Sequence, residues 1–248
     1  MTKFSFEVPI PHLADFDDLQ DFHFCLSMLF SDQRYQDYHQ QVSRQSLRTI
    51  WIDNSFNEKF IADEAHDLLY WYRQMNAAQV VAPDSIEWTT EKIRDSWVDM
   101  SRHVGPNHTI LVLRNHLMYL DLQLLYPQIV AVSYWKRPGM PSAEWSLTEL
   151  QKVKRNQQLH FLGLNNVQEL ITVKPQSCDT SMPIKIALKG QTLKQWIEAG
   201  CSHINTKDLG FQGQSFFNQT MTQEQINLAR RNIIQLKSLL GDETCLIK

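Results

Sequence analysis

Short apolar runs alternate along the chain with longer stretches in which apolar residues recur at helical spacing. The runs are rich in β-branched and aromatic residues and are apolar on both faces, as is typical of buried parallel strands. They are FSFEVPI (4–10), TIWID (49–53), QVVAPD (79–84), TILVLR (109–114), IVAVSYW (129–135), LHFLGL (159–164) and SCDTS (177–181). A weaker eighth run lies near CSHIN (201–205).

Between the runs, the periodicity predicts amphipathic helices. They cover residues 16–30, 60–75, 89–103, 116–126, 146–158 and 222–240. The last begins at Thr222, a good N-cap with Gln225 three residues later. Repeated strand–helix units imply a parallel sheet, and seven or eight of them favour a closed barrel. We therefore predict an α/β fold, a (β/α)8 TIM-like barrel with a C-terminal helix, formed by residues 1–248 as a single domain.

Composition narrows the class of protein. A hydrophobic content of 43% with 21% charged residues is typical of a globular protein with a full core. The formal net charge of −3 excludes a strongly basic protein that binds nucleic acid through its overall charge. It does not exclude a local basic groove that contacts phosphates. No apolar run reaches the roughly 18 residues that cross a bilayer. The N-terminus turns acidic too early for a secretory signal, so we predict a cytoplasmic protein.

The cysteines and histidines indicate neither a metal nor a cofactor. The four cysteines stand far apart with no C-x-x-C pair, which predicts reduced thiols. They are Cys25, Cys178, Cys201 and Cys245. No H-x-H or H-E-x-x-H spacing occurs, and the chain has no nucleophile elbow, P-loop or G-x-G-x-x-G motif. We expect chemistry carried by side chains alone.

Three of the predicted strands end in aspartate: Asp53, Asp84 and Asp179. Active sites of (β/α)8 barrels lie at the C-terminal ends of the strands, so these carboxylates are expected to converge. The alternative is that each aspartate caps the following helix or starts a turn. Clustered carboxylates without metal-ligand spacing suit cleavage of a glycosidic bond, in which an ionised Asp attacks or stabilises a cationic sugar carbon. A second Asp can accept hydrogen bonds from a base edge.

The same residues carry a resemblance to tRNA-guanine transglycosylases. HFLGLNNVQEL (160–170) followed by SCDTSMP (177–183) resembles the stretch in which a glycine-containing strand precedes the nucleophilic aspartate. IWIDNSFNE (50–58) resembles the family's aspartate followed by a small residue and Phe, and VVAPDSIEW (80–88) resembles its base-recognising aspartate. The likeness is to the short phage-associated and bacterial members, some of which act on DNA, and it extends to about Phe217.

The resemblance implies roles for individual residues. Asp179 would be the nucleophile or the stabiliser of the sugar cation, Asp53 the second catalytic carboxylate, and Asp84 a contact to the base. Gly163, Asn54 and Phe56 would line the substrate site. The closely spaced cysteines and histidine that hold zinc in the tRNA enzymes do not follow Asp179 here, which weakens the case for tRNA as substrate.

Further candidates come from strand ends and basic residues. Four residues are expected to contact the substrate, with core packing or a turn as the alternative: Arg114, Asn115, Tyr134 and Trp135. Five basic residues form the best local patch for a phosphate backbone, with a solvated helix face as the alternative: Lys136, Arg137, Lys152, Lys154 and Arg155.

Three functions remain open. The first is a glycosylase that flips a modified base out of DNA, such as glucosylated hydroxymethylcytosine in viral DNA, and leaves an abasic site as a defence. The second is a transglycosylase that inserts a 7-deazaguanine into DNA. The third is a catalytically silent barrel that binds nucleic acid. Lys136 or another lysine could also form a Schiff base with the opened sugar and nick the strand, but no feature of the sequence singles one out.

Overall fold

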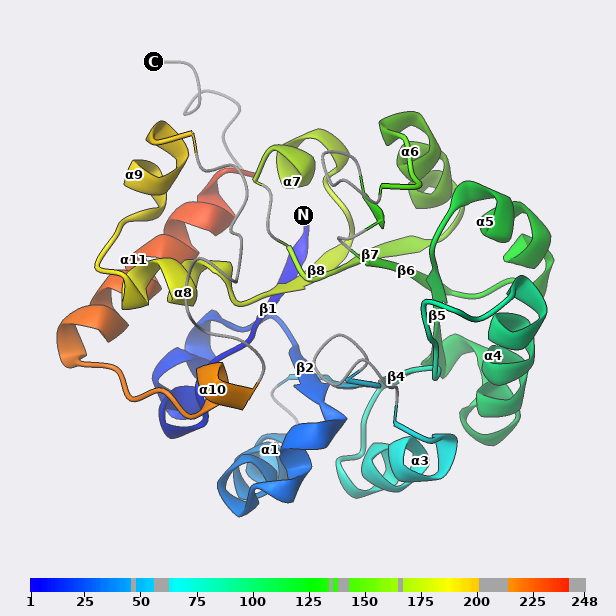
Figure 1. Ribbon diagram of the computed structural model, residues 1–248. Helices are drawn as coiled ribbons and strands as arrows, with labels where there is room; N and C mark the ends of the chain where they lie inside the picture. Colours follow the sequence, from blue (N-terminus) through cyan, green and yellow to red (C-terminus); the bar gives the residue numbers. More distant parts are fainter. Residues whose placement is uncertain are drawn as a thin grey trace. The chain divides into compact units, whose positions relative to one another are not determined.

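The computed structural model describes residues 1–45, 48–55, 63–133, 136–137, 143–164, 167–200 and 214–240. Within these residues eight parallel strands form one sheet in the order β1-β8-β7-β6-β5-β4-β3-β2, with helices between them (Figure 1). The strands are β1 (Lys3–Phe6), β2 (His23–Leu26), β3 (Ile50–Asp53), β4 (Gln79–Val81), β5 (Thr109–Leu113), β6 (Ile129–Ser133), β7 (Gln158–Leu162) and β8 (Ser177–Thr180). The nearly closed barrel and the C-terminal helix confirm the predicted (β/α)8 TIM-like fold.

The α-helices are α1 (Gln33–Gln45), α3 (Ala65–Gln74), α4 (Thr90–Val104), α5 (His116–Leu122), α6 (Leu147–Asn156), α7 (Val167–Val173), α8 (Met182–Leu188), α9 (Leu193–Glu198), α10 (Gln214–Phe217) and α11 (Gln223–Ser238). The helices predicted over 60–75, 89–103, 116–126, 146–158 and 222–240 correspond to α3, α4, α5, α6 and α11, whereas α1, α7, α8, α9 and α10 were not predicted. The 3-10 helices are η1 (Ile10–Leu19), η2 (Ser27–Ser31), η3 (Pro106–His108) and η4 (Gln123–Leu125). In the described ranges, none of these helices is both long and apolar enough to cross a bilayer.

The prediction of one helix over 16–30 is wrong, because this segment holds η1, β2 and η2. Phe22, Phe24 and Leu26 alternate at strand spacing, and all four residues of β2 are buried, so the strand period competes with the helical one. The strand expected near 201–205 lies outside the described residues. β2 is therefore the strand that the apolar runs did not predict.

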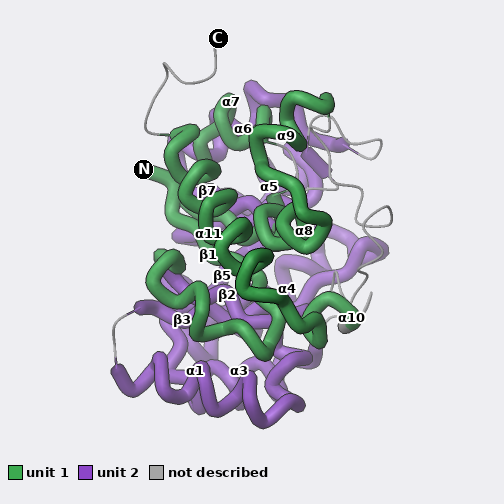
Figure 2. Tube along the Cα trace, turned by 90° about the vertical axis from the view of Figure 1, so that its left-hand side faces the viewer, with its two compact units in different colours: residues 1–21, 163–248 green, residues 22–162 purple. Residues whose placement is uncertain are grey.

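The described residues form two compact units (Figure 2). The unit of residues 22–162, called unit 2, contains the strands β2 to β7. Side chains from these strands pack into one core cluster, which Trp51 covers. Its members are Phe22, Phe24, Val81, Ile110, Val112, Ile129, Ala131 and Leu162. Close-packed, mostly branched and aromatic side chains of this kind fill the interior of barrels of this class.

The other unit, called unit 1, joins the two ends of the chain, residues 1–21 and 163–248. Its strands β1 and β8 pair in parallel, with Ser5 opposite Asp179 and Phe6 opposite Thr180. The helix α11 begins with the predicted capping box of Thr222 and Gln225 and packs on α8 (Figure 1). This pairing brings residues from opposite ends of the chain to the same strand ends.

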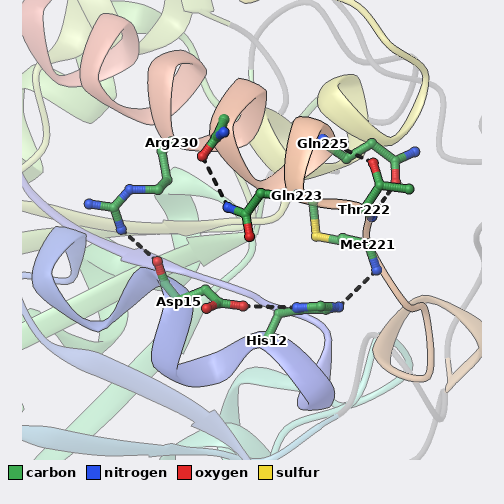
Figure 3. A network of polar contacts seen from close by, with 8 residues as sticks. His12, Asp15, Met221, Thr222, Gln223, Gln225 and Arg230 are labelled. Atoms are coloured by element: carbon green, nitrogen blue, oxygen red, sulfur yellow. Dashed lines mark hydrogen bonds and ion pairs between the residues drawn. The ribbon is translucent and has the colours of Figure 1, made fainter.

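A polar contact ties the start of α11 to η1 (Figure 3). The Met221 backbone N–H donates to His12 Nε2 at 2.8 Å, and His12 Nδ1 lies 2.9 Å from Asp15 Oδ2. Because Nε2 accepts, the ring hydrogen sits on Nδ1 and is donated to the Asp15 carboxylate. Arg230 of α11 donates to the Asp15 carbonyl and to both carboxylate oxygens of Asp18. η1 is thereby held against the C-terminal helix inside unit 1.

Candidate active site

The carboxyl of Asp179 lies at the end of β8 in unit 1 and is 3% exposed. The Gly163 backbone N–H faces both of its oxygens at 3.1 Å. The Leu164 N–H donates to the Asp179 carbonyl at 2.8 Å, so the chain after β7 is fixed against β8 on both sides of the side chain. Gly163 has a φ of 65°, a left-handed conformation that glycine adopts without steric cost. The Gly163 N–H thus fixes the position of the Asp179 carboxyl.

The carboxyl of Glu7 hydrogen-bonds to that of Asp179. Glu7 directly follows β1, and its backbone N–H donates to the Thr180 carbonyl at 3.1 Å, which extends the β1–β8 ladder by one residue. Burial, and then the negative charge of Asp179, raise the pKa of Glu7 from 4.5 to about 7. Two hydrogen-bonded carboxyls need a proton between them. Glu7 is therefore about half protonated at pH 7, and in its protonated form it donates this hydrogen bond to Asp179.

Two further side chains complete this cluster. Ser181 hydrogen-bonds to the Glu7 carboxyl, and the positive charge of Lys185 acts on it, both of which favour the ionised form of Glu7. Lys185 lies on α8, is only 9% exposed, and places its Nζ 4.7 Å from the centroid of the Phe216 ring. We call Glu7, Asp179, Ser181 and Lys185 the unit 1 acidic cluster.

Glu7 and Lys185 were missed by the sequence analysis. The run FSFEVPI (4–10) places Glu7 inside a strand, whereas β1 ends at Phe6 and Glu7 is the first residue beyond it. An acidic residue after an apolar run was the signal used for Asp53, Asp84 and Asp179, and Pro9 two residues later marks the strand end. Lys185 gave no signal, because a lysine in a short helix looks like a solvated residue.

A second polar cluster lies at the ends of β3, β4 and β5 in unit 2. Asn54 Nδ2 donates to Asp84 Oδ1 at 2.7 Å and to the Ala82 carbonyl at 2.8 Å. Both side chains are buried. Burial raises the pKa of Asp84 to about 6, although the hydrogen bond from Asn54 and the charge of Arg114 lower it.

Arg114 continues this second cluster. Its Nη1 donates to the Ile86 carbonyl and, at 3.3 Å, to the Trp88 carbonyl. Its Nη2 lies 3.9 Å from Asp84 Oδ2, and this buried nitrogen has no hydrogen-bond partner in the described part of the chain. A hydrogen-bond acceptor, the Asp84 carboxyl, therefore lies next to a donor, Arg114 Nη2. This arrangement suits a ligand whose edge carries both a donor and an acceptor.

Asp53 directly precedes Asn54 in the sequence. Its side chain is buried and hydrogen-bonds within its own turn. Its Oδ2 accepts from the Ser55 N–H at 2.9 Å, which holds Ser55 at a φ of 56°. Ser55 Oγ lies 2.9 Å from Ser27 Oγ and accepts from the Met28 N–H at 3.1 Å. Asp53 thus fixes the turn after β3 that presents Asn54 to Asp84.

The predicted residues therefore divide between the units. Asp179 and Gly163 contact each other in unit 1, and Asp53, Asn54, Asp84 and Arg114 form one neighbourhood in unit 2. Asn115 is the N-cap of α5 and accepts from the Met118 N–H, the turn role considered from the sequence. The predictions for Phe56, Tyr134 and Trp135 lie outside the described residues.

The predicted basic patch needs one correction, at Arg137. Its side chain is fully buried, its Nη1 donates to the Val132 carbonyl at 2.8 Å and to the Leu162 carbonyl at 3.2 Å, and it stacks on Phe161. A guanidinium committed to carbonyls at the ends of β6 and β7 is not available to a phosphate.

The other basic residues lie nearer the surface. Lys136 forms an ion pair with Glu144, whereas Lys152 and Arg155 of α6 are exposed and Lys154 is half-buried. The part of the chain that the structure describes holds no group of three or more His, Cys, Asp or Glu side chains that could bind a metal.

The sequence matches no family model and no curated protein. Solved structures with a similar fold include a putative dihydrodipicolinate synthetase from Pseudomonas aeruginosa, with 10% identity, a TM-score of 0.53, and 97% of this chain and 84% of that chain covered. KGPDC from Streptococcus mutans has 9% identity, a TM-score of 0.52 and coverage of 97% and 100%. Thiamine phosphate pyrophosphorylase from Pyrococcus furiosus has 9% identity, a TM-score of 0.51 and coverage of 96% and 97%. These likenesses support the barrel fold alone.

Proposed function

We propose that this protein is a glycosylase that excises a modified base from DNA and leaves an abasic site. The observation that carries the proposal is the hydrogen-bonded pair of Glu7 and Asp179 at the C-terminal ends of β1 and β8. In barrels of this fold that end of the strands holds the active site. The resemblance of residues 160–183 to the transglycosylase nucleophile segment supports the assignment of Asp179.

The two carboxyls have different roles in the cleavage of the N-glycosidic bond. Asp179, positioned by the Gly163 N–H, attacks or stabilises C1′ as positive charge develops on the sugar. Glu7, with a pKa raised to about 7, is about half protonated at pH 7, and its protonated form donates the proton to the departing base. The substrate replaces the hydrogen bond between the two carboxyls. Water then attacks C1′ and gives its proton to the Glu7 carboxylate, which restores the acid and completes the hydrolysis.

The target nucleotide has to leave the base stack before a carboxylate can reach its C1′. The exposed Lys152 and Arg155 are the best candidates to contact a phosphate backbone. A hypermodified base of viral DNA, such as glucosylated hydroxymethylcytosine, is the proposed target, since removal of an ordinary base would damage the cell's own genome.

The test incubates the protein with unmodified DNA, DNA containing hypermodified cytosines, and tRNA. Released base is measured by mass spectrometry and abasic sites by alkaline cleavage. We expect base release from modified DNA only. Covalent incorporation of an added 7-deazaguanine would instead favour base exchange, and binding without either product would favour a silent nucleic-acid-binding barrel.

Replacement of the proposed nucleophile gives a sharper test of the same site. Asp179→Asn keeps the shape of the side chain but removes its charge, so we expect base release to fall by at least about 10²-fold. The control is Asp67→Asn, on the exposed first turn of α3. Release by Asp179→Asn close to that of the control would exclude the carboxylate from the mechanism.

A further inference from the structure

We propose that Lys185 is a second nucleophile, which forms a Schiff base with the abasic sugar and cleaves the strand on its 3′ side. This inference rests on the proposed function, because the base-excision step supplies the abasic sugar. It assigns a lyase activity to the same cluster and names the residue that carries it.

The position of Lys185 supports this role. Lysines are seldom so well buried, and Lys185, which is 9% exposed, lies on α8, the helix that directly follows β8 and its Asp179. Its ammonium is held over the Phe216 ring at 4.7 Å, and its charge acts on the Glu7 carboxyl. The amine of Lys185 and the carboxyls of Glu7 and Asp179 therefore belong to one cluster in unit 1, and imine formation on a sugar aldehyde requires an amine with an acid–base group.

The chemistry balances without a further reactant. The Lys185 ammonium gives a proton to a carboxylate of the pair, and the neutral amine attacks the C1′ aldehyde of the opened abasic sugar. The carbonyl oxygen leaves as water with two hydrogens from the original ammonium, which gives an iminium. A carboxylate then removes a proton from C2′, and the C3′–O bond breaks with its electron pair on the departing phosphate. Water hydrolyses the iminium and returns the amine of Lys185.

Other lysines offer a weaker arrangement. Lys136, at the end of β6, forms an ion pair with Glu144 and lies beside no carboxyl pair. Lys237 of α11 donates to Asp21 Oδ1 at 2.9 Å on a part-exposed surface. Lys189, four residues after Lys185, is exposed at the end of α8 and so provides a matched control.

The experiment uses the full-length protein and a synthetic DNA duplex that already contains one abasic site. Sodium borohydride reduces an iminium to a stable amine, so a protein–DNA adduct on a denaturing gel reports the intermediate. We expect an adduct whose digested peptide carries the sugar on Lys185. Lys185→Arg keeps the positive charge but cannot form the iminium, so trapping and strand cleavage should fall by at least 100-fold, while Lys189→Arg retains both.

Each other outcome overturns the inference: no adduct with the wild-type protein, an adduct on a different lysine, or equal trapping by Lys185→Arg. If Lys185→Arg fails to fold, as judged by circular dichroism, the adduct site in the wild-type protein still decides. The preformed abasic site separates the two proposals. Base release without trapping would remove the lyase role alone, whereas trapping on Lys185 without base release from any modified DNA would remove the glycosylase alone.

Discussion

At the scale of single residues, the shared proton of Glu7 and Asp179 sets how this cluster responds to pH. The pKa of Glu7 is raised to about 7, first by burial and then by the charge of Asp179. A group of this kind is an acid at neutral pH and becomes a second negative charge under alkaline conditions. Two adjacent carboxylates would then repel each other, and the cluster would lose its proton donor.

The pH profile of base release follows from this protonation. Because Glu7 must be protonated to act as the acid, the rate with the free enzyme should fall about tenfold per pH unit above pH 7. Glu7→Gln removes the donated proton and should lower the rate by about 10²–10⁴-fold and abolish this alkaline decline. The exposed Glu87→Gln is the control. An unchanged alkaline decline in Glu7→Gln would assign the titration to another group.

Stability should change over the same pH range. The pKa of Glu7 in the folded protein lies above its ordinary value of 4.5, so the folded state binds the proton more tightly than the unfolded state. The stabilisation from that proton is complete below about pH 4.5 and is lost as the pH rises through about 7. Urea unfolding at pH 5 and pH 8 should therefore show Glu7→Gln gaining stability relative to the wild type at the higher pH. A pH-independent difference would contradict the assignment.

At the scale of secondary-structure elements, α11 is fixed to unit 1 by a buried amide. Asn232 is 1% exposed, and its Oδ1 accepts from the Leu193 N–H at 2.8 Å. Its Nδ2 donates to the Pro183 carbonyl at 3.2 Å and to the Gln191 carbonyl at 3.1 Å. One side chain thus satisfies backbone groups at the beginning of both α8 and α9.

Replacement of this amide should weaken the packing of α11. Asn232→Ala leaves a buried N–H and two carbonyls without their partner, and each unsatisfied buried group costs about 1–3 kcal/mol. We expect a loss of about 3 kcal/mol or more in the free energy of unfolding, measured by urea denaturation. The exposed Asn227→Ala, one turn earlier on the same helix, should change it by less than about 0.5 kcal/mol. Equal effects of the two substitutions would show that the buried contacts add nothing.

Most elements could be predicted because their apolar period was clear. The runs that became β5 and β6 are apolar at nearly every position, a pattern that only a strand buried on both faces needs. By contrast α1 is mainly polar, and its three buried side chains, Tyr35, His39 and Val42, include only one aliphatic residue. Its fold depends on packing that no local pattern encodes.

The site was predictable only in part, for a related reason. Asp53, Asp84 and Asp179 follow apolar runs, and a parallel barrel places such residues at strand ends whatever their separation in sequence. The partner of Asp179 depends instead on strand register, because Glu7 reaches it only when Ser5 lies opposite Asp179. Strand register and the burial of Lys185 depend on tertiary structure, so the apolar periodicity of the sequence does not predict them.

At the scale of the whole molecule, one compact unit is inserted into the other along the sequence. Residues 22–162 of unit 2 are inserted between the two segments of unit 1. The β1–β8 pair and the α11 contacts both join these distant segments. Closing so long a loop costs entropy, which these contacts inside unit 1 help to offset.

Local opening should therefore differ between the units. If each unit opens as its own cooperative group, Asn232→Ala should speed hydrogen exchange in β1 and β8 and leave β5 and β6 unaffected. Exchange measured by mass spectrometry at low urea concentration, with Asn227→Ala as the control, tests this. An equal increase in all four strands would mean that both units open together.

The pairing of the first strand with the last also orders events during protein synthesis. Glu7 leaves the ribosome 172 residues before Asp179. Every nascent or prematurely terminated chain that ends before Asp179 carries a Glu7 without the carboxyl with which it shares a proton. The reactive pair thus comes into being only once Asp179 has been made, so truncated products that end before it are chemically incomplete.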